Sequence, residues 1–379
     1  MSAQVEPFRA IAISRLAHEL QAAGRSIIHM EFGQPSTGAP RAAIEAMHRV
    51  LDTSALGYWE SPALKARIAR HYGETYRVKV DPEQVVLTCG ASPALLLAFI
   101  SRFEPGDRVA LARPGYVAYR NTLRALRMVP VELACGAASR YQLTAAAIEA
   151  LDPPPAGVII ASPANPTGTI IAAAELEAIV AVCDNRNIQI ISDEIYHGWS
   201  YTEPAHSITE FEPNAMVVNS FSKYYCMTGW RLGWLLTPPQ HIERVRSYAG
   251  NLFLCAPTPS QHTALVAMDS REELDANIVT YRRNRTLLLQ ALPALGLDAI
   301  APPDGAFYIY ADVKHLTDDS MQFCIELLHD TGVAMAPGVD FDPIEGRHFV
   351  RMSFAASTDD MEEALSRLRP WFIARARVV

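Results

Sequence analysis

Short apolar runs alternate with longer helical patterns through the centre of this chain. Each run is four to six residues long, and the runs lie at 85–89, 108–112, 128–133, 157–161, 188–192 and 216–219. Continuous apolar runs, rather than alternating ones, are typical of strands that are covered on both faces. The alternation of such strands with helices predicts a mostly parallel sheet in a three-layer α/β large domain.

The pattern changes near residue 270. The stretch from Arg271 to Leu292 contains neither glycine nor proline and predicts a long helix. Further predicted elements are three strands and a final helix, at 305–310, 332–336, 348–354 and 359–371. This mixture is typical of a smaller α+β domain.

The length of 379 residues also favours two domains, because a single hydrophobic core rarely grows beyond roughly 250–300 residues. We expect an N-terminal arm at 1–30, a large domain at 31–270 and a small C-terminal domain at 271–379. The arm is expected to pack on the small domain or on a partner subunit.

The charge and cysteine patterns exclude several classes of protein. The net charge of -8, from 33 Lys+Arg and 41 Asp+Glu, argues against a general nucleic-acid binder. The six cysteines have no C-x-x-C spacing, which predicts free thiols, no metal site and a reducing, cytoplasmic location. The chain lacks an apolar signal core and any uncharged stretch near the roughly 20 residues that span a bilayer, so we expect no membrane partner.

Four segments place polar residues where predicted strands end, and open parallel sheets bind ligands at that edge. In the first, Ser92 suits a helix N-cap and Pro93 the first helical position, so the N–H groups there could bind a phosphate. An ordinary capped helix is the alternative. In the second, prolines and a glycine hold Asn165 in a rigid turn, which is either a ligand contact or a plain loop.

The third segment carries Asp193 at the end of an apolar strand, where a buried carboxylate needs a favourable partner. A helix cap or a salt bridge is the alternative. The fourth holds Ser220, Ser222, Lys223 and Arg231 within twelve positions. The hydroxyls and the guanidinium suit a phosphate. The apolar and aromatic neighbours of Lys223 predict a lowered pKa and a nucleophilic amine rather than a surface lysine.

Eight short motifs, in the same order along the chain, resemble those of class I and II aminotransferases, which are fold-type-I enzymes dependent on pyridoxal 5'-phosphate (PLP). The motifs are Gly33-Gln34-Pro35, Gly90-Ala91-Ser92, Pro114-Gly115-Tyr116, Asn165-Pro166-Thr167-Gly168, Asp193-Glu194-Ile195-Tyr196, Ser220-Phe221-Ser222-Lys223, Gly229-Trp230-Arg231-Leu232-Gly233 and Arg351-Met352-Ser353-Phe354. One such match is weak, but eight in order are very specific. The resemblance implies the PLP-dependent transferase fold and a homodimer with shared active sites.

The resemblance also implies a role for each matching residue. Lys223 would hold PLP as a Schiff base and then carry the substrate's Cα proton, while Asp193 would keep the pyridine nitrogen protonated. Tyr196 and Asn165 would hydrogen-bond the ring hydroxyl, and Tyr116 would stack on the ring.

The same resemblance assigns the two anionic groups. The phosphate would be bound by Ala91, Ser92, Ser220, Ser222 and Arg231, with Tyr58 reaching over from the partner subunit. The substrate's α-carboxylate would be held by Arg351 through a bidentate contact, with Asn165 and the backbone of Gly33 beside it.

The implied reaction is a ping-pong transfer of the α-amino group of an L-amino acid to a 2-oxo acid such as 2-oxoglutarate or pyruvate. Trp59 beside Tyr58 favours a neutral or aromatic amino acid, although the segment after Tyr58 is shorter than in relatives and lacks a glycine found there. A carbon–sulfur β-lyase on the same scaffold and a non-catalytic PLP-domain regulator remain alternatives. A nicotinamide dehydrogenase is excluded, because no G-x-G-x-x-G follows a predicted strand.

Overall fold

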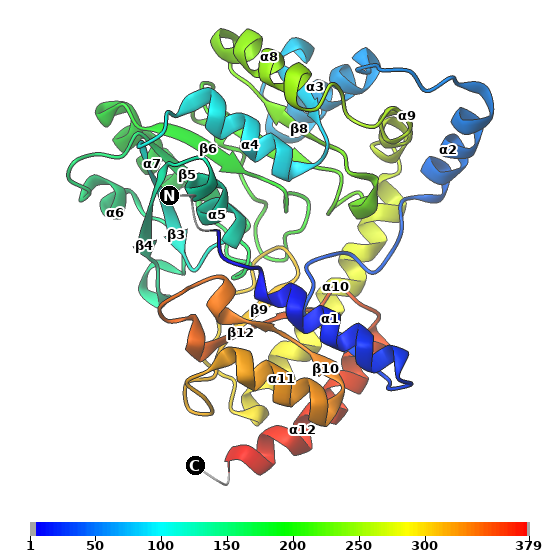
Figure 1. Ribbon diagram of the computed structural model, residues 1–379, viewed down its shortest axis with the longest axis vertical. Coiled ribbons are helices and arrows are strands. Elements are labelled where there is room, and N and C mark those ends of the chain that lie inside the picture. Colours follow the sequence, from blue (N-terminus) through cyan, green and yellow to red (C-terminus); the bar gives the residue numbers. More distant parts are fainter. Residues whose placement is uncertain (1–4, 377–379) are drawn as a thin grey trace.

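A computed structural model describes residues 5–376 of the chain. Its largest feature is a seven-stranded sheet in the order β2-β8-β7-β6-β5-β3-β4 (Figure 1). The strands are β2 (Val85–Thr88), β3 (Arg108–Arg113), β4 (Val129–Ala134), β5 (Gly157–Ala161), β6 (Gln189–Asp193), β7 (Met216–Ser220) and β8 (Gly233–Leu236). Only β8 runs against its neighbours, so the predicted mostly parallel α/β sheet is confirmed.

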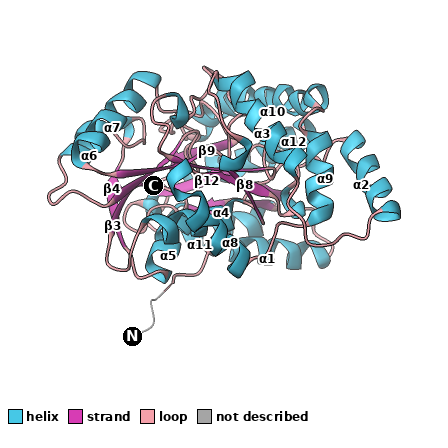
Figure 2. Ribbon diagram, turned by 90° about the horizontal axis from the view of Figure 1, so that it is seen from above, coloured by secondary structure: helices cyan, strands magenta, loops and turns pink. Residues whose placement is uncertain are grey.

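Helices cover both faces of this sheet, and each face buries its own apolar cluster (Figure 2). One face is covered by α3 (Pro62–Tyr76), α6 (Ala145–Glu149), α7 (Ala173–Arg186) and α9 (Thr258–Ala267). The other is covered by α4 (Ala91–Arg102), α5 (Val117–Ala125) and α8 (Ile242–Leu252). Burial on both sides is the physical reason why the strand sequences are continuously apolar.

The start of α4 differs from the sequence-based expectation. Gly90, rather than Ser92, is the N-cap, and the helix begins at Ala91. Gly90 has a φ of 100°, a left-handed conformation that glycine adopts without steric cost, so the chain turns into the helix earlier than expected. Ser92 therefore lies inside the first turn, with its N–H still free of an intrahelical partner.

The C-terminal region is built on a smaller antiparallel sheet in the order β11-β12-β9. Its strands are β9 (Tyr308–Asp312), β11 (Ala336–Pro337) and β12 (Phe349–Ser353), and a separate parallel pair joins β1 (Ile28–His29) to β10 (Val333–Ala334). The strand predicted at 332–336 was wrong as one element, because its two ends pair in different sheets. Residues 305–307 form a turn before β9, so that strand begins later than predicted.

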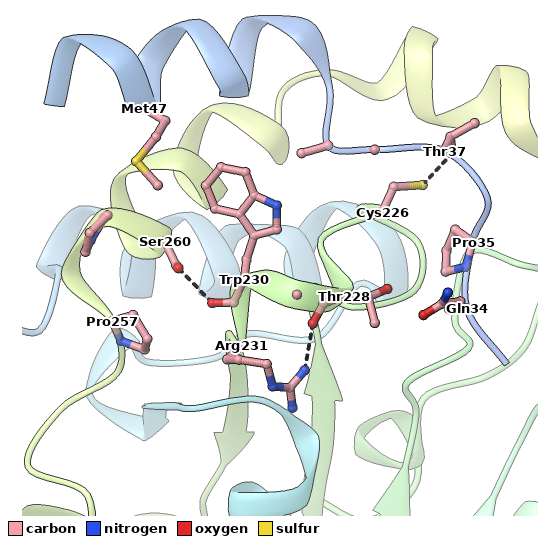
Figure 3. A pocket seen from close by; sticks show the side chains of 14 residues that line it. Gln34, Pro35, Thr37, Met47, Cys226, Thr228, Trp230, Arg231, Pro257 and Ser260 are labelled. Atoms are coloured by element: carbon pink, nitrogen blue, oxygen red, sulfur yellow. Dashed lines mark hydrogen bonds between the residues drawn. The ribbon is translucent and has the colours of Figure 1, made fainter. Parts of the chain in front are cut away.

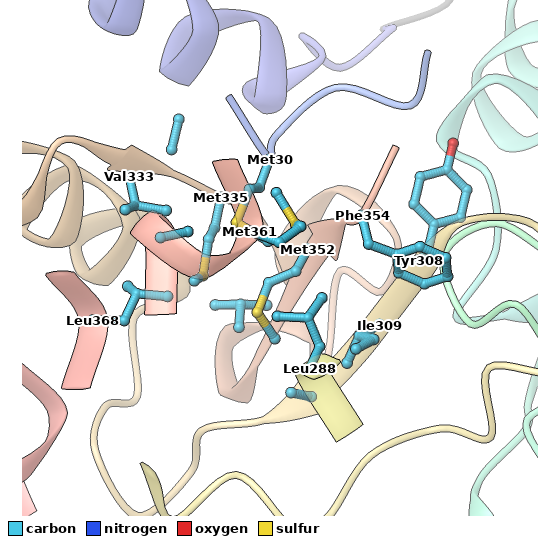
Figure 4. Packing of buried hydrophobic residues seen from close by; sticks show 14 of the residues in the cluster. Met30, Leu288, Tyr308, Ile309, Val333, Met335, Met352, Phe354, Met361 and Leu368 are labelled. Atoms are coloured by element: carbon cyan, nitrogen blue, oxygen red, sulfur yellow. The ribbon is translucent and has the colours of Figure 1, made fainter. Parts of the chain in front are cut away.

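Helices enclose this smaller sheet. They are α1 (Arg9–Ala22), α10 (Arg271–Ala291), α11 (Ser320–Thr331) and α12 (Thr358–Ala376), while α2 (Arg41–Thr53) packs on α9 instead. The N-terminal α1 contacts β10, β11 and α11. α12 runs through Pro370 and ends five residues later than predicted. Figure 4 shows the buried cluster here, with Tyr308 at its edge.

No helix in the described part of the chain is long and apolar enough to cross a membrane.

Candidate active site

Three neighbouring strands bring the predicted polar residues to one edge of the large sheet. Asn165 follows β5, Asp193 ends β6, and Ser220 ends β7 just before Ser222 and Lys223. Parallel strands that are adjacent in a sheet have their carboxyl ends side by side, so residues far apart in sequence meet there.

Lys223 lies at the centre of this group. Its Nζ donates a hydrogen bond to the carbonyl oxygen of Gly33 and lies 5.8 Å from the ring centroid of Tyr196. Removal of the amine from water, together with the positive charges of Arg351 and Arg231, lowers the pKa of Lys223 to about 8. A substantial fraction of this amine is therefore neutral near physiological pH, as a nucleophile or a base requires.

Asp193 is buried and accepts hydrogen bonds on both oxygens. Its Oδ1 accepts from the backbone N–H of Ile195 at 3.1 Å, and its Oδ2 accepts from the hydroxyl of Tyr119 at 2.6 Å. Burial raises the pKa of Asp193, while these donors and the charge of Lys223 act in the opposite direction. Tyr119 was not predicted as a site residue, although it lies in the first turn of α5, three residues after the N-cap Tyr116, and the two rings meet edge-on.

Two hydroxyls and a guanidinium cluster at the end of β7. The Ser220 hydroxyl donates to Ser222 Oγ at 2.8 Å, and Arg231 Nη1 lies 3.5 Å from the same oxygen. Arg231 also crosses close to Gly90, where a side-chain carbon would overlap with its guanidinium. Ala91 and Ser92 open α4 directly after this glycine, so the structure gathers the predicted anion-binding groups in one place.

Arg351 lies in β12 and is 2% exposed. Its Nη1 donates to Asn165 Oδ1 at 2.9 Å and its Nη2 to the backbone oxygen of Glu31 at 2.5 Å. The guanidinium carbon stands 4.5 Å from the ring centroid of Tyr308 and 4.8 Å from that of Phe341. Neither aromatic ring was predicted as part of the site.

Tyr308 connects several predicted residues. Its hydroxyl lies 2.5 Å from that of Tyr196, and a side-chain carbon at Gly33 would overlap with it. Position 33 therefore requires glycine, because the Tyr308 ring lies against it. The family resemblance gave a different reason, the approach of the substrate carboxylate to the Gly33 backbone. The strand pattern placed Tyr308 in the strand that became β9, but it did not predict the contact with Arg351. In the register of β9 with β12, Arg351 pairs with Tyr310, and the ring of Tyr308, two residues along the same strand, lies beside the guanidinium.

Tyr58 is the one predicted residue that stays outside this group within its own chain. Its side chain is 84% exposed, and the next residue, Trp59, stacks on His262 with ring centroids 4.7 Å apart. Beside Arg231 lies an open cavity of about 630 Å³ (Figure 3). Met47, Trp230 and Ser260 contribute to its wall.

Comparisons with known proteins define the class. The family model for class I and II aminotransferases matches residues 25–368, and the chain belongs to that family. The chain is 46% identical to a valine–pyruvate aminotransferase of Mycobacterium tuberculosis over 98% of this chain and 97% of that protein.

Solved structures agree with this assignment. A crystal structure of an aminotransferase from M. tuberculosis superposes with a TM-score of 0.96 at 46% identity, covering 99% of this chain and 98% of the other. A putative aminotransferase from Silicibacter pomeroyi gives 0.94 at 47% identity, with 99% of both chains covered.

The protein is therefore an aminotransferase that moves amino groups between amino acids and 2-oxo acids. The relatives favour this activity over the carbon–sulfur lyase and the non-catalytic regulator.

Proposed function

We propose that this enzyme uses PLP to transfer the amino group of a small apolar amino acid, valine, to pyruvate. The observation that carries the choice of substrates is the 46% identity, over nearly the whole chain, to a valine–pyruvate aminotransferase. The aromatic rings of Tyr308 and Phe341, which both lie beside the guanidinium of Arg351, support an apolar substrate side chain. Valine as the amino donor narrows the broader expectation of a neutral or aromatic amino acid.

The residues at the sheet edge fit PLP by their chemistry. Lys223 offers an amine with a lowered pKa for the aldehyde, and Asp193 offers a buried carboxylate for the ring nitrogen. For the phosphate, α4 starts without a side-chain cap among the described residues, so its first N–H groups are available beside Arg231. Ser220, Ser222, Ala91 and Ser92 complete the proposed phosphate site.

When bound, PLP supplies an electron sink for the charge left at the substrate's Cα. The protein's own part is to orient and to move a proton. Arg351, Asn165 and the Gly33 backbone would hold the α-carboxylate, while Lys223 would take the Cα proton at its Nζ. Two fixed anchors select which Cα bond is broken, an orientation effect worth roughly several kcal/mol. Tyr196 and Tyr116 would contact the ring.

We further propose a homodimer in which Tyr58 of each subunit completes the other's phosphate site. The 84% exposure of Tyr58 supports this, since an exposed aromatic side chain is available to a second subunit. The six cysteines are free thiols, which supports the proposed cytoplasmic location.

A donor and acceptor panel tests the proposal. The purified enzyme with PLP is offered valine, alanine, phenylalanine or aspartate, each with pyruvate or 2-oxoglutarate, and the new 2-oxo acid is measured. We expect the highest kcat/KM with valine and pyruvate. A preference for aspartate with 2-oxoglutarate would overturn the substrate assignment, and ammonia release from cystathionine without transfer would overturn the reaction.

A further inference from the structure

We propose that Tyr119 is a positioning residue whose hydroxyl keeps Asp193 ionised and correctly oriented toward the ring nitrogen of the cofactor. The inference deepens the proposed function and depends on PLP being the cofactor. It concerns a residue that no motif of the chain singled out.

The geometry of the contact supports this role. The Tyr119 hydroxyl lies 2.6 Å from Asp193 Oδ2, the short separation typical of an O–H donor to a charged carboxylate. Tyr119 is only 6% exposed, so water does not readily replace this bond. The other oxygen, Oδ1, accepts from the Ile195 backbone, and thus two donors from different elements fix the carboxylate plane.

The charge balance around Asp193 makes the hydroxyl important. Burial disfavours the ionised carboxylate and raises its pKa, and hydrogen bonds to the charged form oppose that effect. A ring nitrogen paired with Asp193 shares a proton with it. If the carboxylate lost the Tyr119 donor, Asp193 would bind that proton more strongly. The ring would then lose positive charge and accept electrons less well.

Packing explains why Tyr119 holds this position. Its ring meets that of Tyr116 edge-on at 5.4 Å, and both lie at the start of α5. The rest of the Tyr119 side chain is part of the apolar cluster between the sheet and α4. Replacing tyrosine by phenylalanine retains this packing and removes only the donor, so Tyr119→Phe isolates the hydrogen bond.

The experiment compares holoenzymes of the wild type, Tyr119→Phe and Tyr310→Phe. Tyr310 is a matched control, because it is also buried and its hydroxyl has no partner among the described residues. The visible absorbance of the Lys223-bound cofactor is titrated against pH. Less positive charge on the ring raises the proton affinity of the Lys223 linkage, so the midpoint should rise by about half a unit or more in Tyr119→Phe only.

Kinetics provide a second measurement. We expect kcat of Tyr119→Phe to fall roughly 10-fold to 100-fold, the range for a lost hydrogen bond to a charged group. KM for the amino acid should change little, because Arg351 is untouched. A Tyr119→Phe enzyme that matches Tyr310→Phe in both the titration midpoint and kcat would show that Tyr119 only packs, and would overturn the inference.

Thermal unfolding of the apo-proteins controls for folding, and Tyr119→His serves as a second variant because imidazole can donate to the same oxygen. Recovery of the wild-type midpoint in Tyr119→His supports the donor role, and a midpoint equal to that of Tyr119→Phe contradicts it. A wild-type enzyme that neither binds PLP nor transfers amino groups would instead refute the proposed function, so the two failures are distinguishable.

Discussion

At the residue scale, the environment of Lys223 sets when its amine can react. Its pKa of about 8 predicts that the apo-protein binds PLP covalently at a rate that rises with pH and levels off above a midpoint near 8, because only the neutral amine attacks the aldehyde. The rate of appearance of the visible absorbance, measured across pH, checks this. Lys223→Arg is the control and should give no covalent complex. A midpoint near the ordinary lysine value of 10.5 would contradict the assigned environment.

Gly90 offers a second residue-scale prediction. Its φ of 100° and its contact with Arg231 leave no room for a side chain. We expect Gly90→Ala to displace the guanidinium and to raise the Kd for PLP about tenfold or more, equivalent to about 1.4 kcal/mol or more. Fluorescence titration of the apo-protein measures this Kd. Gly136→Ala, where nothing lies within 4 Å of the added carbon, should bind PLP like the wild type.

At the element scale, the segment before α1 bridges two parts of the molecule. The backbone oxygen of Glu6 accepts from Asn121 Nδ2 on α5 at 3.0 Å. A few residues later, Asp340 accepts from the N–H groups of Arg9 and Ala10 at 2.8 and 2.6 Å. Because Asp340 precedes Phe341, this arrangement fixes the start of α1 beside the aromatic wall of Arg351.

We therefore expect Asp340→Ala to lower the free energy of unfolding by about 2–3 kcal/mol, because it leaves two N–H groups of a helix start without an acceptor. KM for the amino acid should rise as well, because the contact of Asp340 with α1 helps to hold the adjacent Phe341 beside Arg351. Denaturant unfolding and steady-state kinetics measure the two effects. Asp318→Ala, at an exposed position, should change neither value; equal behaviour of the two variants would refute the bridging role.

The accuracy of the element predictions depended on whether burial or local backbone geometry decides the element. β5 at Gly157–Ala161 coincides with its predicted range because both faces of this strand are covered, so every residue had to be apolar. β8 was missed because it returns antiparallel directly after the turn at Thr228–Trp230, in a segment whose polar residues indicated a ligand-binding loop. The start of α4 was misplaced because a glycine conformation, rather than a capping side chain, begins the helix.

At the scale of the whole molecule, only some residues of the candidate site could be predicted from the sequence. Lys223, Asp193 and Arg351 could be predicted because strand ends and motifs mark them. Tyr119 and Phe341 could not, because their roles arise from contacts between elements whose relative placement is a property of the tertiary fold. Tyr58 was assigned by the family resemblance alone, and its role stays a prediction because it requires a second copy of the chain.

The proposed homodimer gives the last prediction. Tyr58 and Leu254 are large, exposed side chains, and the segments that carry them are joined through α9, where Thr258 Oγ1 donates to the oxygen of Gly57. Leu254 has a φ of 63°, which aspartate tolerates better than leucine does, so Leu254→Asp should not harm an isolated subunit. In a dimer it would bury a charge at the interface.

We expect sedimentation to show a wild-type dimer and a Leu254→Asp monomer, with weaker PLP binding in the monomer because the partner's Tyr58 is lost. Val279→Asp replaces an even more exposed apolar residue on α10 and should remain dimeric. Because the two substitutions add the same charge to exposed positions, a general effect on solubility would appear in both. A Leu254→Asp protein that stays dimeric would place the interface elsewhere, whereas a monomer with wild-type affinity for PLP would remove Tyr58 from the phosphate site.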